Sequence, residues 1–560
     1  MRQRSIQKRI MEPTQIQREI INESGNTVVL ASPGSGKTFV MSEKIKRLLR
    51  GDDMLDYQGV IAISYTRKAS AHLKRKTLTD GVWEKNSFFG TIDSFCLTQI
   101  LLPFGSYVMG YPTKDVIPIA EEELDEERKL DFEWISEIHP DYGDIKAPTW
   151  QLLYNLYLEG YVLINSLELM ALHIIKKCKA CREHLKARFK YVFFDEFQDA
   201  DTYTNGIFHE LICLGLIANA VGDPNQSIFG FVHKVSDYLV ALETEPGFKA
   251  FRLADNFRCS TPIVNYSNRL LDAECEIIET REEGVELITV SGDEVIVAEY
   301  LSNTIGEDCK KWEVADLSQV AILVKNKETQ TYIDNNLDIP HRVVASTPLD
   351  NDVNPRSRLY SLLLQFYFDK RMPFMAVLDE YVDYDLFTKT VKQKLLLLRE
   401  KIMSVEAADI PDVFPVLFKE VGEIILPKFQ EGSSMNNLKT VLGNEKLIDT
   451  YKPLMDNEVV IMTLHKAKGL EFDIVYHLNM NEWELPNKLP KDGDFDNLFY
   501  PQYEQDLNLH FVGITRARKL CSLITSTKRH NRNDTVKKSS PSEFLFINGV
   551  DELRNDYKYE

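Results

Sequence analysis

The chain of 560 residues lacks any run of about 20 apolar residues, the length needed to span a bilayer, so we expect no association with membranes. The N-terminal segment 1–13 is basic but contains no apolar stretch, so we expect that it is not a secretory signal. Cysteine is scarce as well. Its eight residues are scattered rather than set in a regular frame, as is typical of reduced thiols. We therefore expect a cytoplasmic protein without disulfides.

Positive charge is also in short supply. Lysine and arginine number 66 against 85 aspartates and glutamates, which leaves a net charge of −19. A chain this acidic cannot coat nucleic acid along its whole surface, because phosphate contacts need local positive charge. Three short basic stretches occur at 74–76, 176–190 and 528–538, and taken alone each is more simply explained as a solvated surface than as a nucleic-acid contact. Any nucleic-acid binding is therefore expected in a defined groove.

Apolar and charged residues are present in the proportions of an ordinary globular protein, 44% and 27%, and the length suggests three to four domains. Short apolar runs alternate with helical segments, which favours an α/β fold with mainly parallel sheets. The clearest runs are 27–30, 60–63, 191–194, 320–324 and 459–462.

Two long segments lack this strand pattern and look helical, so we interpret them as insertions within α/β domains. The predicted division is a first domain of 1–102 and 191–275 with an insertion at 103–190, and a second domain of 276–353 and 447–560 with a short insertion at 354–446.

A glycine-rich loop at 31–38 follows the apolar run 27–30 directly and leads into a helical segment at 39–49. Backbone N–H groups of such a loop close around phosphate, and the following helix adds a favourable dipole. In this pattern the lysine reaches the β- and γ-phosphates and the hydroxyl after it binds Mg²⁺. The sequence therefore predicts ATP and Mg²⁺ as ligands. The expected contacts are Ser32, Pro33, Gly34, Ser35, Gly36, Lys37 and Thr38, with Ala31 where the general pattern has its first glycine.

Two carboxylates, Asp195 and Glu196, directly follow the apolar run 191–194. At the end of a strand one carboxylate can hold Mg²⁺, and its neighbour can orient and deprotonate the attacking water. We assign the metal to Asp195 and the base to Glu196. Together with the phosphate loop, this pair predicts a site of ATP hydrolysis.

These two motifs stand in order among seven others, and the set resembles the superfamily-one helicases of the UvrD/Rep/PcrA type. The resemblance implies two RecA-like P-loop domains, each with a mainly helical insertion, and a DNA-dependent ATPase with 3′→5′ polarity. The other segments are PTQIQ at 13–17, SYTRKA at 64–69, GTIDS at 90–94, VGDPNQSIF at 221–229, NFR at 256–258, MTLHKAKGLEF at 462–472 and VGITRA at 512–517.

By this resemblance the catalytic set gains Gln226 as a sensor of the γ-phosphate and Arg258 and Arg516 as arginines at the phosphates. Negative charge spreads over the γ-phosphoryl oxygens in the transition state, where an arginine can be worth about 10³–10⁵ in rate. If Arg516 comes from the second domain, hydrolysis becomes coupled to relative motion of the domains. Further nucleotide contacts implied by the family are Gln17 and Phe257 at the adenine, with Gly469 and Glu471.

The resemblance also implies contacts with single-stranded DNA. Bases stack on aromatic side chains with about 1–3 kcal/mol each and without sequence preference. The implied contacts are Tyr65, Thr66, Arg67, Thr91, Phe229, Phe231, Thr463 and His465. Core packing remains an equal alternative for Phe229.

The chain departs from the family pattern in four places. Asp93 stands where the family has histidine, Val232–Lys234 replaces an arginine-containing segment, and Glu504–Asn508 replaces an acid–arginine run before the last motif. The second insertion is also much shorter than in full-length UvrD. These departures bear on the coupling between DNA and ATP and on processive unwinding.

A narrower resemblance is to the helicase subunit of the Gabija antiphage system. The segments that carry it are 90–95, 101–104, 255–259, 265–268 and 347–355. It implies a partner nuclease of the OLD type with ATPase and TOPRIM domains.

Three alternative functions stay open. Beside the leading hypothesis, a DNA-dependent ATPase that translocates on DNA or unwinds it, these are a DNA-end sensor whose ATP turnover gates a nuclease, a stand-alone DNA repair helicase, and a RecA-like ATPase without nucleic acid. A rival zinc site, Cys178, Cys181 and His184, lacks a fourth ligand and a second cysteine pair.

Overall fold

The structure is a computed structural model of the chain. It describes residues 12–560 except 80, 120, 122–123, 127, 131, 133–139, 229–236, 353, 379–380, 382–386, 428, 430, 492–493 and 532–533. The chain divides into two compact units. Unit 1 comprises Met1–Val108, Ile138–Ile145 and Leu167–Arg258, and unit 2 comprises Met109–Glu137, Lys146–Ser166 and Cys259–Glu560.

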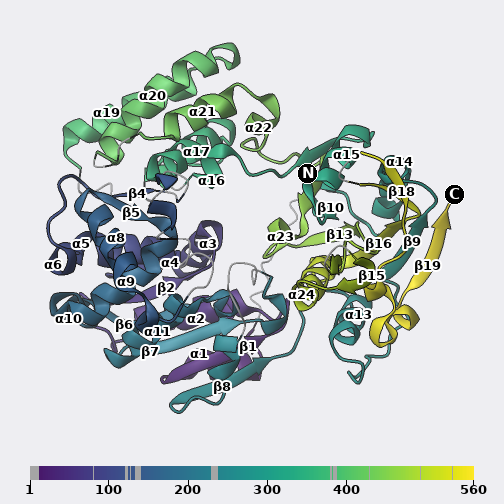
Figure 1. The fold of residues 1–560 in the computed structure, drawn as a ribbon, viewed down its shortest axis with the longest axis horizontal. Helices are drawn as coiled ribbons and strands as arrows, with labels where there is room; N and C mark the ends of the chain where they lie inside the picture. The colour runs from purple at the N-terminus through teal and green to yellow at the C-terminus, as the bar shows by residue number, and fades with distance from the viewer. Residues whose placement is uncertain are drawn as a thin grey trace, which may run out of the picture. The chain divides into compact units, whose positions relative to one another are not determined.

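Unit 1 is built on a six-stranded parallel sheet in the order β3-β2-β6-β7-β1-β8 (Figure 1). Its central strands are buried on both faces, which explains why the sequence shows them as short unbroken apolar runs. The strands are β1 (Asn26–Ala31), β2 (Gly59–Ile63), β3 (Phe88–Gly90), β6 (Phe189–Phe194), β7 (Ile217–Gly222) and β8 (Phe248–Leu253).

Helices connect these parallel strands, as crossover connections require. The helix α2 (Lys37–Arg50) follows β1 and packs Val40, Met41 and Ile45 into the core of the unit. The other described helices of unit 1 are α1 (Gln15–Asn22), α3 (Arg67–Thr77), α4 (Ile92–Phe95), η1 (Cys96–Leu101), α5 (Leu102–Phe104), η3 (Tyr142–Asp144), α9 (Leu167–Lys177), α10 (Lys179–Arg188), η5 (Phe197–Asp199), α11 (Thr202–Cys213), η6 (Pro224–Gln226) and α12 (Asp237–Ala241), and α6 (Ser106–Met109) ends at the boundary between the units.

Unit 2 is built on a seven-stranded parallel sheet in the order β11-β12-β10-β13-β16-β9-β19. Its strands are β9 (Val285–Val290), β10 (Val320–Val324), β11 (His341–Val343), β12 (Val459–Thr463), β13 (Phe472–His477), β16 (Ala517–Ser526) and β19 (Asn555–Tyr559). Its main helices outside the insertions are α13 (Thr261–Leu271), α14 (Glu294–Lys311), α15 (Lys327–Asn336), α16 (Pro348–Asn351), α23 (Leu464–Ala467) and α24 (Tyr503–Ile514), with short hairpins β14–β15 (Leu489–Lys491, Asp494–Phe499) and β17–β18 (Lys528–His530, Val536–Lys538).

Both predicted insertions lie in crossovers between strands of one sheet. The first lies between β3 and β6 and contains α8 (Ala147–Leu158) and a pair of short parallel strands, β4 (Ile117–Ile119) and β5 (Tyr161–Leu163). By compactness this part belongs to unit 2, whereas α9 and α10 belong to unit 1. The second insertion lies between the neighbouring strands β11 and β12.

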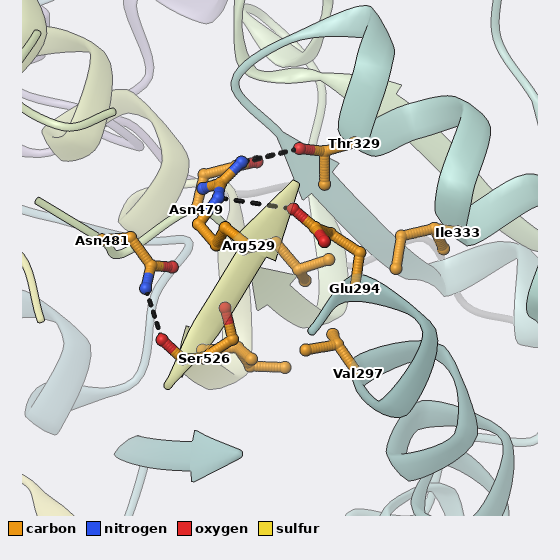
Figure 2. A pocket seen from close by; sticks show the side chains of 10 residues that line it. Glu294, Val297, Thr329, Ile333, Asn479, Asn481, Ser526 and Arg529 are labelled. Atoms are coloured by element: carbon orange, nitrogen blue, oxygen red, sulfur yellow. Dashed lines mark hydrogen bonds and ion pairs between the residues drawn. The ribbon is translucent and has the colours of Figure 1, made fainter. Parts of the chain in front are cut away.

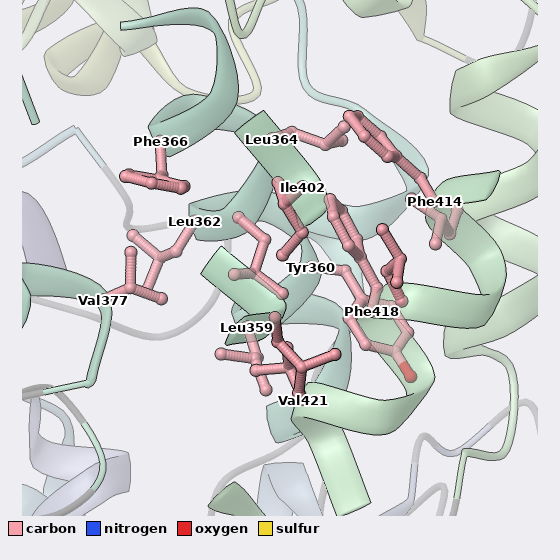
Figure 3. Packing of buried hydrophobic residues seen from close by; sticks show 14 of the residues in the cluster. Leu359, Tyr360, Leu362, Leu364, Phe366, Val377, Ile402, Phe414, Phe418 and Val421 are labelled. Atoms are coloured by element: carbon pink, nitrogen blue, oxygen red, sulfur yellow. The ribbon is translucent and has the colours of Figure 1, made fainter. Parts of the chain in front are cut away.

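The second insertion has a hydrophobic core of its own (Figure 3). In this core Phe414 and Phe418 stack with ring centroids 4.8 Å apart, and Tyr360 packs on Phe418. Its helices are α17 (Pro355–Phe368), α18 (Phe374–Leu378), α19 (Lys389–Met403), α20 (Ile410–Ile425), α21 (Ser434–Leu442) and α22 (Glu445–Asp449). The expected α/β fold with parallel sheets and helical insertions is confirmed. In the part of the chain that the structure describes, no helix is both long and apolar enough to cross a bilayer.

Candidate nucleotide and nucleic-acid site

Apart from Gln17 on α1, the candidate residues of unit 1 follow the carboxyl ends of its parallel strands. Across the sheet from β3 to β8 they occur in the order Thr91, Tyr65, Asp195, Asp223, the phosphate loop 31–38 and Asn256. This edge is where open α/β sheets bind ligands. The expected metal and water-activating residues on β6 therefore lie between the expected DNA segments on β2 and β3 and the phosphate loop on β1.

The phosphate loop adopts the conformation that its glycines predict. Gly34 and Gly36 have φ of 71° and 89°, and α2 begins at Lys37 without a side-chain cap. A β-carbon on Gly34 would lie 2.5 Å from the Asn256 side chain, and one on Gly36 would lie 2.9 Å from Gln17. The backbone of the loop is thus enclosed by neighbouring motifs, and the uncapped N-terminus of α2 remains available for an anion.

The Lys37 ammonium is buried and has no hydrogen-bond partner among the described residues. It lies 3.7 Å from a carboxylate oxygen of Glu196. A buried ammonium without hydrogen bonds is costly in an isolated protein, and phosphate oxygens of a nucleotide satisfy it. The loop therefore fits the triphosphate that the sequence predicts, and the Thr38 hydroxyl and the buried carboxylate of Asp195 are the groups suited to Mg²⁺.

The proposed base Glu196 has a left-handed backbone, with φ of 57° and ψ of 40°. Such a backbone conformation is uncommon for residues other than glycine and asparagine, and it often occurs at functional sites. It turns the carboxylate toward Lys37 on one side and toward Gln198, whose amide donates to it at 2.5 Å, on the other.

Asp223 and Gln226, at the end of β7, belong to the same cluster. Gln226 donates its amide to Asp223 at 2.6 Å, and Asp223 is fully buried. Burial raises the pKa of Asp223, while Lys37 and Gln226 act in the opposite direction. The expected γ-phosphate sensor is therefore held next to the phosphate loop by a buried carboxylate that the sequence motif alone did not single out.

The remaining nucleotide candidates of unit 1 surround the loop. Gln17 is buried and donates its amide to the Ser35 carbonyl at 3.0 Å. Phe257 donates its backbone N–H to the Gly34 carbonyl at 3.0 Å, and its ring is half exposed. Arg258 is tied to Asn256 through its backbone N–H at 2.8 Å. The first and the last motif of unit 1 thus converge on one loop.

In unit 2 the expected nucleotide residues come together at the amino ends of β13 and β16. Arg516 donates to the Leu470 carbonyl at 3.1 Å, next to Gly469 and Glu471. Its backbone carbonyl accepts from Phe472 at 2.9 Å. The Glu471 carboxylate accepts from Arg518 at 2.5 Å, a pairing that the sequence motifs did not indicate.

The expected DNA residues of unit 2, Thr463 and His465, lie at the opposite edge of the same sheet, after the carboxyl end of β12. Thr463 precedes α23, and burial together with Lys325 and Lys468 lowers the pKa of His465 to about 4. His465 is therefore neutral at physiological pH. The sheet separates the two sets of residues, although 463–471 is one continuous motif.

The DNA candidates of unit 1 are partly described. Thr66 and Thr91 are N-caps of α3 and α4, and Tyr65 is half-buried beside them. Arg67 begins α3, but its side chain is outside the described part of the chain. Phe229 and Phe231 also lie outside the described residues, as does the departure at 232–234.

A buried pair of histidines joins β13 to α24, the helix that precedes Arg516. His510 Nδ1 lies 3.0 Å from His477 Nε2, and both residues are fully buried. The Leu478 carbonyl, which can only accept, lies 3.0 Å from His477 Nδ1. His477 therefore donates from Nδ1 and accepts the proton of His510 at Nε2, which fixes the tautomer of each ring.

The basic stretch at 528–538 forms the hairpin β17–β18. Lys528 stands directly opposite Lys538, and Arg529 stands opposite Lys537. Opposed like charges weaken a hairpin unless an anion joins them. Figure 2 shows how the hairpin is anchored: Arg529 donates to Thr329 at 3.2 Å and pairs with Glu294 at 3.4 Å.

The polar groups that line the small pocket of Figure 2 thus form hydrogen bonds with one another, and Asn481 likewise donates to the Ser526 carbonyl at 2.8 Å.

The other two basic stretches, 74–76 and 176–190, are partly neutralised by carboxylates. Lys74 pairs with Glu84, and Lys176 and Arg182 pair with Glu210.

The rival zinc site gains no support. Cys178 and Cys181 are buried, and burial raises the pKa of Cys181 to about 12, which opposes the thiolate that zinc requires. Among the described residues no cluster of three or more metal-ligating side chains occurs.

Two families match the chain. Residues 13–108 and 112–245 match the UvrD/REP helicase N-terminal domain, and residues 386–528 match the UvrD-like helicase C-terminal domain. Among curated proteins, the Gabija protein GajB of Bacillus cereus is 23% identical over 522 residues, which cover 92% of this chain and 95% of that protein. The ATP-dependent DNA helicase Rep of Escherichia coli is 22% identical over 637 residues, with 95% and 93% covered. The ATP-dependent DNA helicase PcrA of Staphylococcus epidermidis is 22% identical, with 93% and 84% covered.

Proposed function

Because the chain belongs to the UvrD/Rep-type DNA helicases and is an ATP hydrolase of that kind, we propose that it couples ATP hydrolysis to translocation on DNA or to its unwinding. The observation that supports this most is the order of residues along one sheet edge of unit 1. The carboxylates after β6 stand between the phosphate loop after β1 and the DNA-type segments after β2 and β3. A change at the phosphates therefore has a short path to bound DNA.

The chemistry follows from the residues at the phosphate loop. Lys37 and the N-terminus of α2 bind the phosphates, and Glu196 takes the proton of the attacking water. Thr38 and Asp195 would hold Mg²⁺, which would supply neutralisation of the negative charge on the phosphates. Gln226 reports whether the γ-phosphate is present.

Arg258 and Arg516 are the arginines proposed to stabilise the transition state. Gln17, Phe257, Gly469 and Glu471 are proposed to hold the nucleoside part of ATP. We propose that Tyr65, Thr66, Arg67, Thr91, Phe229, Phe231, Thr463 and His465 track single-stranded DNA. The exposed lysines of the β17–β18 hairpin add phosphate contacts, which the opposed like charges favour. The polarity proposed from the family is 3′→5′.

For the biological role we propose antiphage defence together with a partner nuclease of the OLD type. The match to GajB spans nearly the full length of both proteins in 522 positions, whereas the match to Rep needs 637 positions, more than this chain contains. The short second insertion thus suits a GajB-like protein better than a stand-alone repair helicase. The second candidate function is a DNA-end sensor that gates the nuclease with little unwinding.

The deciding experiment measures ATP turnover without DNA and with single-stranded, blunt and 3′-tailed DNA, with strand displacement recorded in the same reactions. A translocase is stimulated by single strands and displaces a strand from the tailed duplex. An end sensor is stimulated by blunt ends and displaces little.

Lys37→Ala and Glu196→Gln provide the matched controls for this experiment. Lys37→Ala removes the phosphate clamp, so nucleotide affinity falls together with turnover. Glu196→Gln keeps the shape of the side chain and removes the base, so turnover is lost while ATP and DNA remain bound. Near-normal turnover in Glu196→Gln contradicts the assignment of the base.

A further inference from the structure

We propose that Gln198 is a positioning residue for ATP hydrolysis, which orients the Glu196 carboxylate and connects it to the segment of Asp223 and Gln226. The inference rests on the proposed ATPase function and adds a residue that none of the motif assignments includes. Gln198 lies on η5, two residues after Glu196, and its side chain is completely buried.

Each polar atom of the Gln198 side chain has a defined partner. The amide nitrogen donates to Glu196 Oε2 at 2.5 Å, and the amide oxygen accepts the backbone N–H of Asp223 at 3.0 Å. The backbone carbonyl of Gln198 accepts the Ser227 hydroxyl at 3.4 Å. A buried amide held at both ends has one orientation, because turning it over would place donor against donor and acceptor against acceptor.

In this arrangement the two oxygens of the Glu196 carboxylate face different side chains. Oε1 lies 3.7 Å from the Lys37 ammonium, and Oε2 accepts from Gln198. A base must lie within hydrogen-bond reach of the water that it deprotonates, and an error of about 1 Å can cost about 100-fold in rate. Gln198 fixes the plane of the carboxylate between the lysine that binds phosphate and the end of β7.

The approach of Gln198 to β7 depends on Gly222. A β-carbon at Gly222 would lie 2.3 Å from the Gln198 amide oxygen and 3.2 Å from its backbone nitrogen. The next residue, Asp223, holds Gln226 at 2.6 Å. Gln198 therefore links the proposed base, through Asp223, to the proposed γ-phosphate sensor.

The test compares Gln198→Leu, Gln198→Glu and Gly222→Ala in the full-length protein, with Gln330→Leu as control. Gln330 is also a buried glutamine, but its amide donates to the Ile461 carbonyl in unit 2. Steady-state ATP turnover is measured from pH 5.5 to 9, and binding of a non-hydrolysable ATP analogue is measured separately. Gln198→Leu is expected to lower kcat roughly 10- to 100-fold and to leave analogue affinity unchanged. Its activity also falls off at a higher pH on the acid side, because the carboxylate loses a donor that favours its charged form.

Gln198→Glu supplies a signature that a purely structural role does not produce. The ionised side chain repels Glu196, whereas its protonated form donates again, so activity relative to wild type rises as the pH falls. Gly222→Ala displaces Gln198 without removing it and is expected to lower kcat in the same way. Gln330→Leu keeps wild-type kinetics.

Wild-type kcat in Gln198→Leu overturns the proposal, and so does a loss of analogue affinity in parallel with kcat, which marks a structural defect of the loop. If Gln198→Leu does not fold, Gly222→Ala and the pH trend of Gln198→Glu decide the matter by themselves. Wild-type protein without ATP turnover, or full turnover in Lys37→Ala, instead refutes the proposed function.

Discussion

Arg516 occupies a site in unit 2 that already fixes the direction of its guanidinium group. The side chain is 1% exposed and donates to the Val512 carbonyl at 3.0 Å, to the Leu470 carbonyl at 3.1 Å and to the Thr515 hydroxyl at 3.1 Å. A planar group held by acceptors on several sides loses little entropy when it meets a phosphate.

If Arg516 acts in the transition state, Arg516→Ala lowers kcat by at least about 10³ and leaves nucleotide affinity nearly unchanged. Arg516→Lys does not restore the rate, because an ammonium cannot reproduce the fork of donors. Steady-state kinetics and equilibrium binding of an ATP analogue provide the measurement. Affinity that falls in step with kcat would mean that Arg516 binds the ground state.

The conformation of the phosphate loop and the position of Asp195 and Glu196 after a strand were predictable because each belongs to a continuous stretch of chain that begins at the end of a strand. Gln198 was visible in the same stretch, but its role depends on Asp223, which reaches it only because β6 and β7 pair in the sheet. The pairing of Glu471 with Arg518 depends in the same way on the pairing of β13 with β16. Contacts of this kind follow from strand order, which local sequence patterns do not specify.

At the scale of elements, α24 is attached to the sheet of unit 2 along its length. Asp506 pairs with Lys325 at the end of β10, and His510 bonds to His477 at the end of β13. Burial lowers the pKa of His477 to about 4, with Lys325 adding to the effect, and burial together with His477 and Arg554 also lowers the pKa of His510. Both rings are therefore neutral in the folded protein at neutral pH.

The pH dependence of stability follows from these values. An unfolded histidine takes up a proton near pH 6.5, whereas folded His477 does so only near pH 4, so stability is full above about pH 6.5 and falls as the pH drops toward 4. The loss from His477 alone is roughly 3 kcal/mol. The double variant His477→Leu, His510→Phe is expected to flatten the decline of Tm over this range.

His173 and His465 also have pKa values lowered to about 4 by burial, so the decline becomes smaller in the double variant but does not vanish. A thermal melting series from pH 4 to 8 measures it. An unchanged slope in the double variant contradicts the neutral, hydrogen-bonded pair.

The second insertion, with helices α17–α22, is expected to unfold independently of the sheet of unit 2. Phe418 is fully buried between Phe414 and Tyr360, and its replacement by alanine is expected to cost about 3–5 kcal/mol. Because the core of the insertion is its own, Phe418→Ala should open α17–α22 to limited proteolysis while ATP turnover without DNA stays near wild type. Phe546→Ala, at an exposed phenylalanine, is the control. If Phe418→Ala lowers resistance to proteolysis and ATP turnover to the same extent, the insertion and the sheet of unit 2 unfold together.

At the scale of the whole molecule, a net charge of −19 limits DNA binding to a few phosphate contacts. The logarithm of affinity should therefore fall only shallowly with the logarithm of salt, by about 0.7 for each single-strand phosphate neutralised. Replacing Lys528, Lys537 and Lys538 by glutamate is expected to remove up to three phosphate contacts. The dependence of affinity on salt should become shallower by the corresponding amount. Reversal of three exposed lysines elsewhere changes the net charge equally and serves as the control: Lys370, Lys439 and Lys558. If both triple variants change the slope alike, the hairpin makes no specific contact.

The crossover between β11 and β12 has a consequence for how such a protein can diversify. These strands are neighbours in register, from His341 opposite Val459 to Val343 opposite Ile461, and a connection of about a dozen residues is enough to join parallel neighbours. The chain uses the whole stretch 344–458 instead and encloses a separate core within it. A longer or shorter insertion between β11 and β12 leaves the pairing of these two strands unchanged. Selection can therefore change this insertion while the sheet of unit 2 is inherited intact.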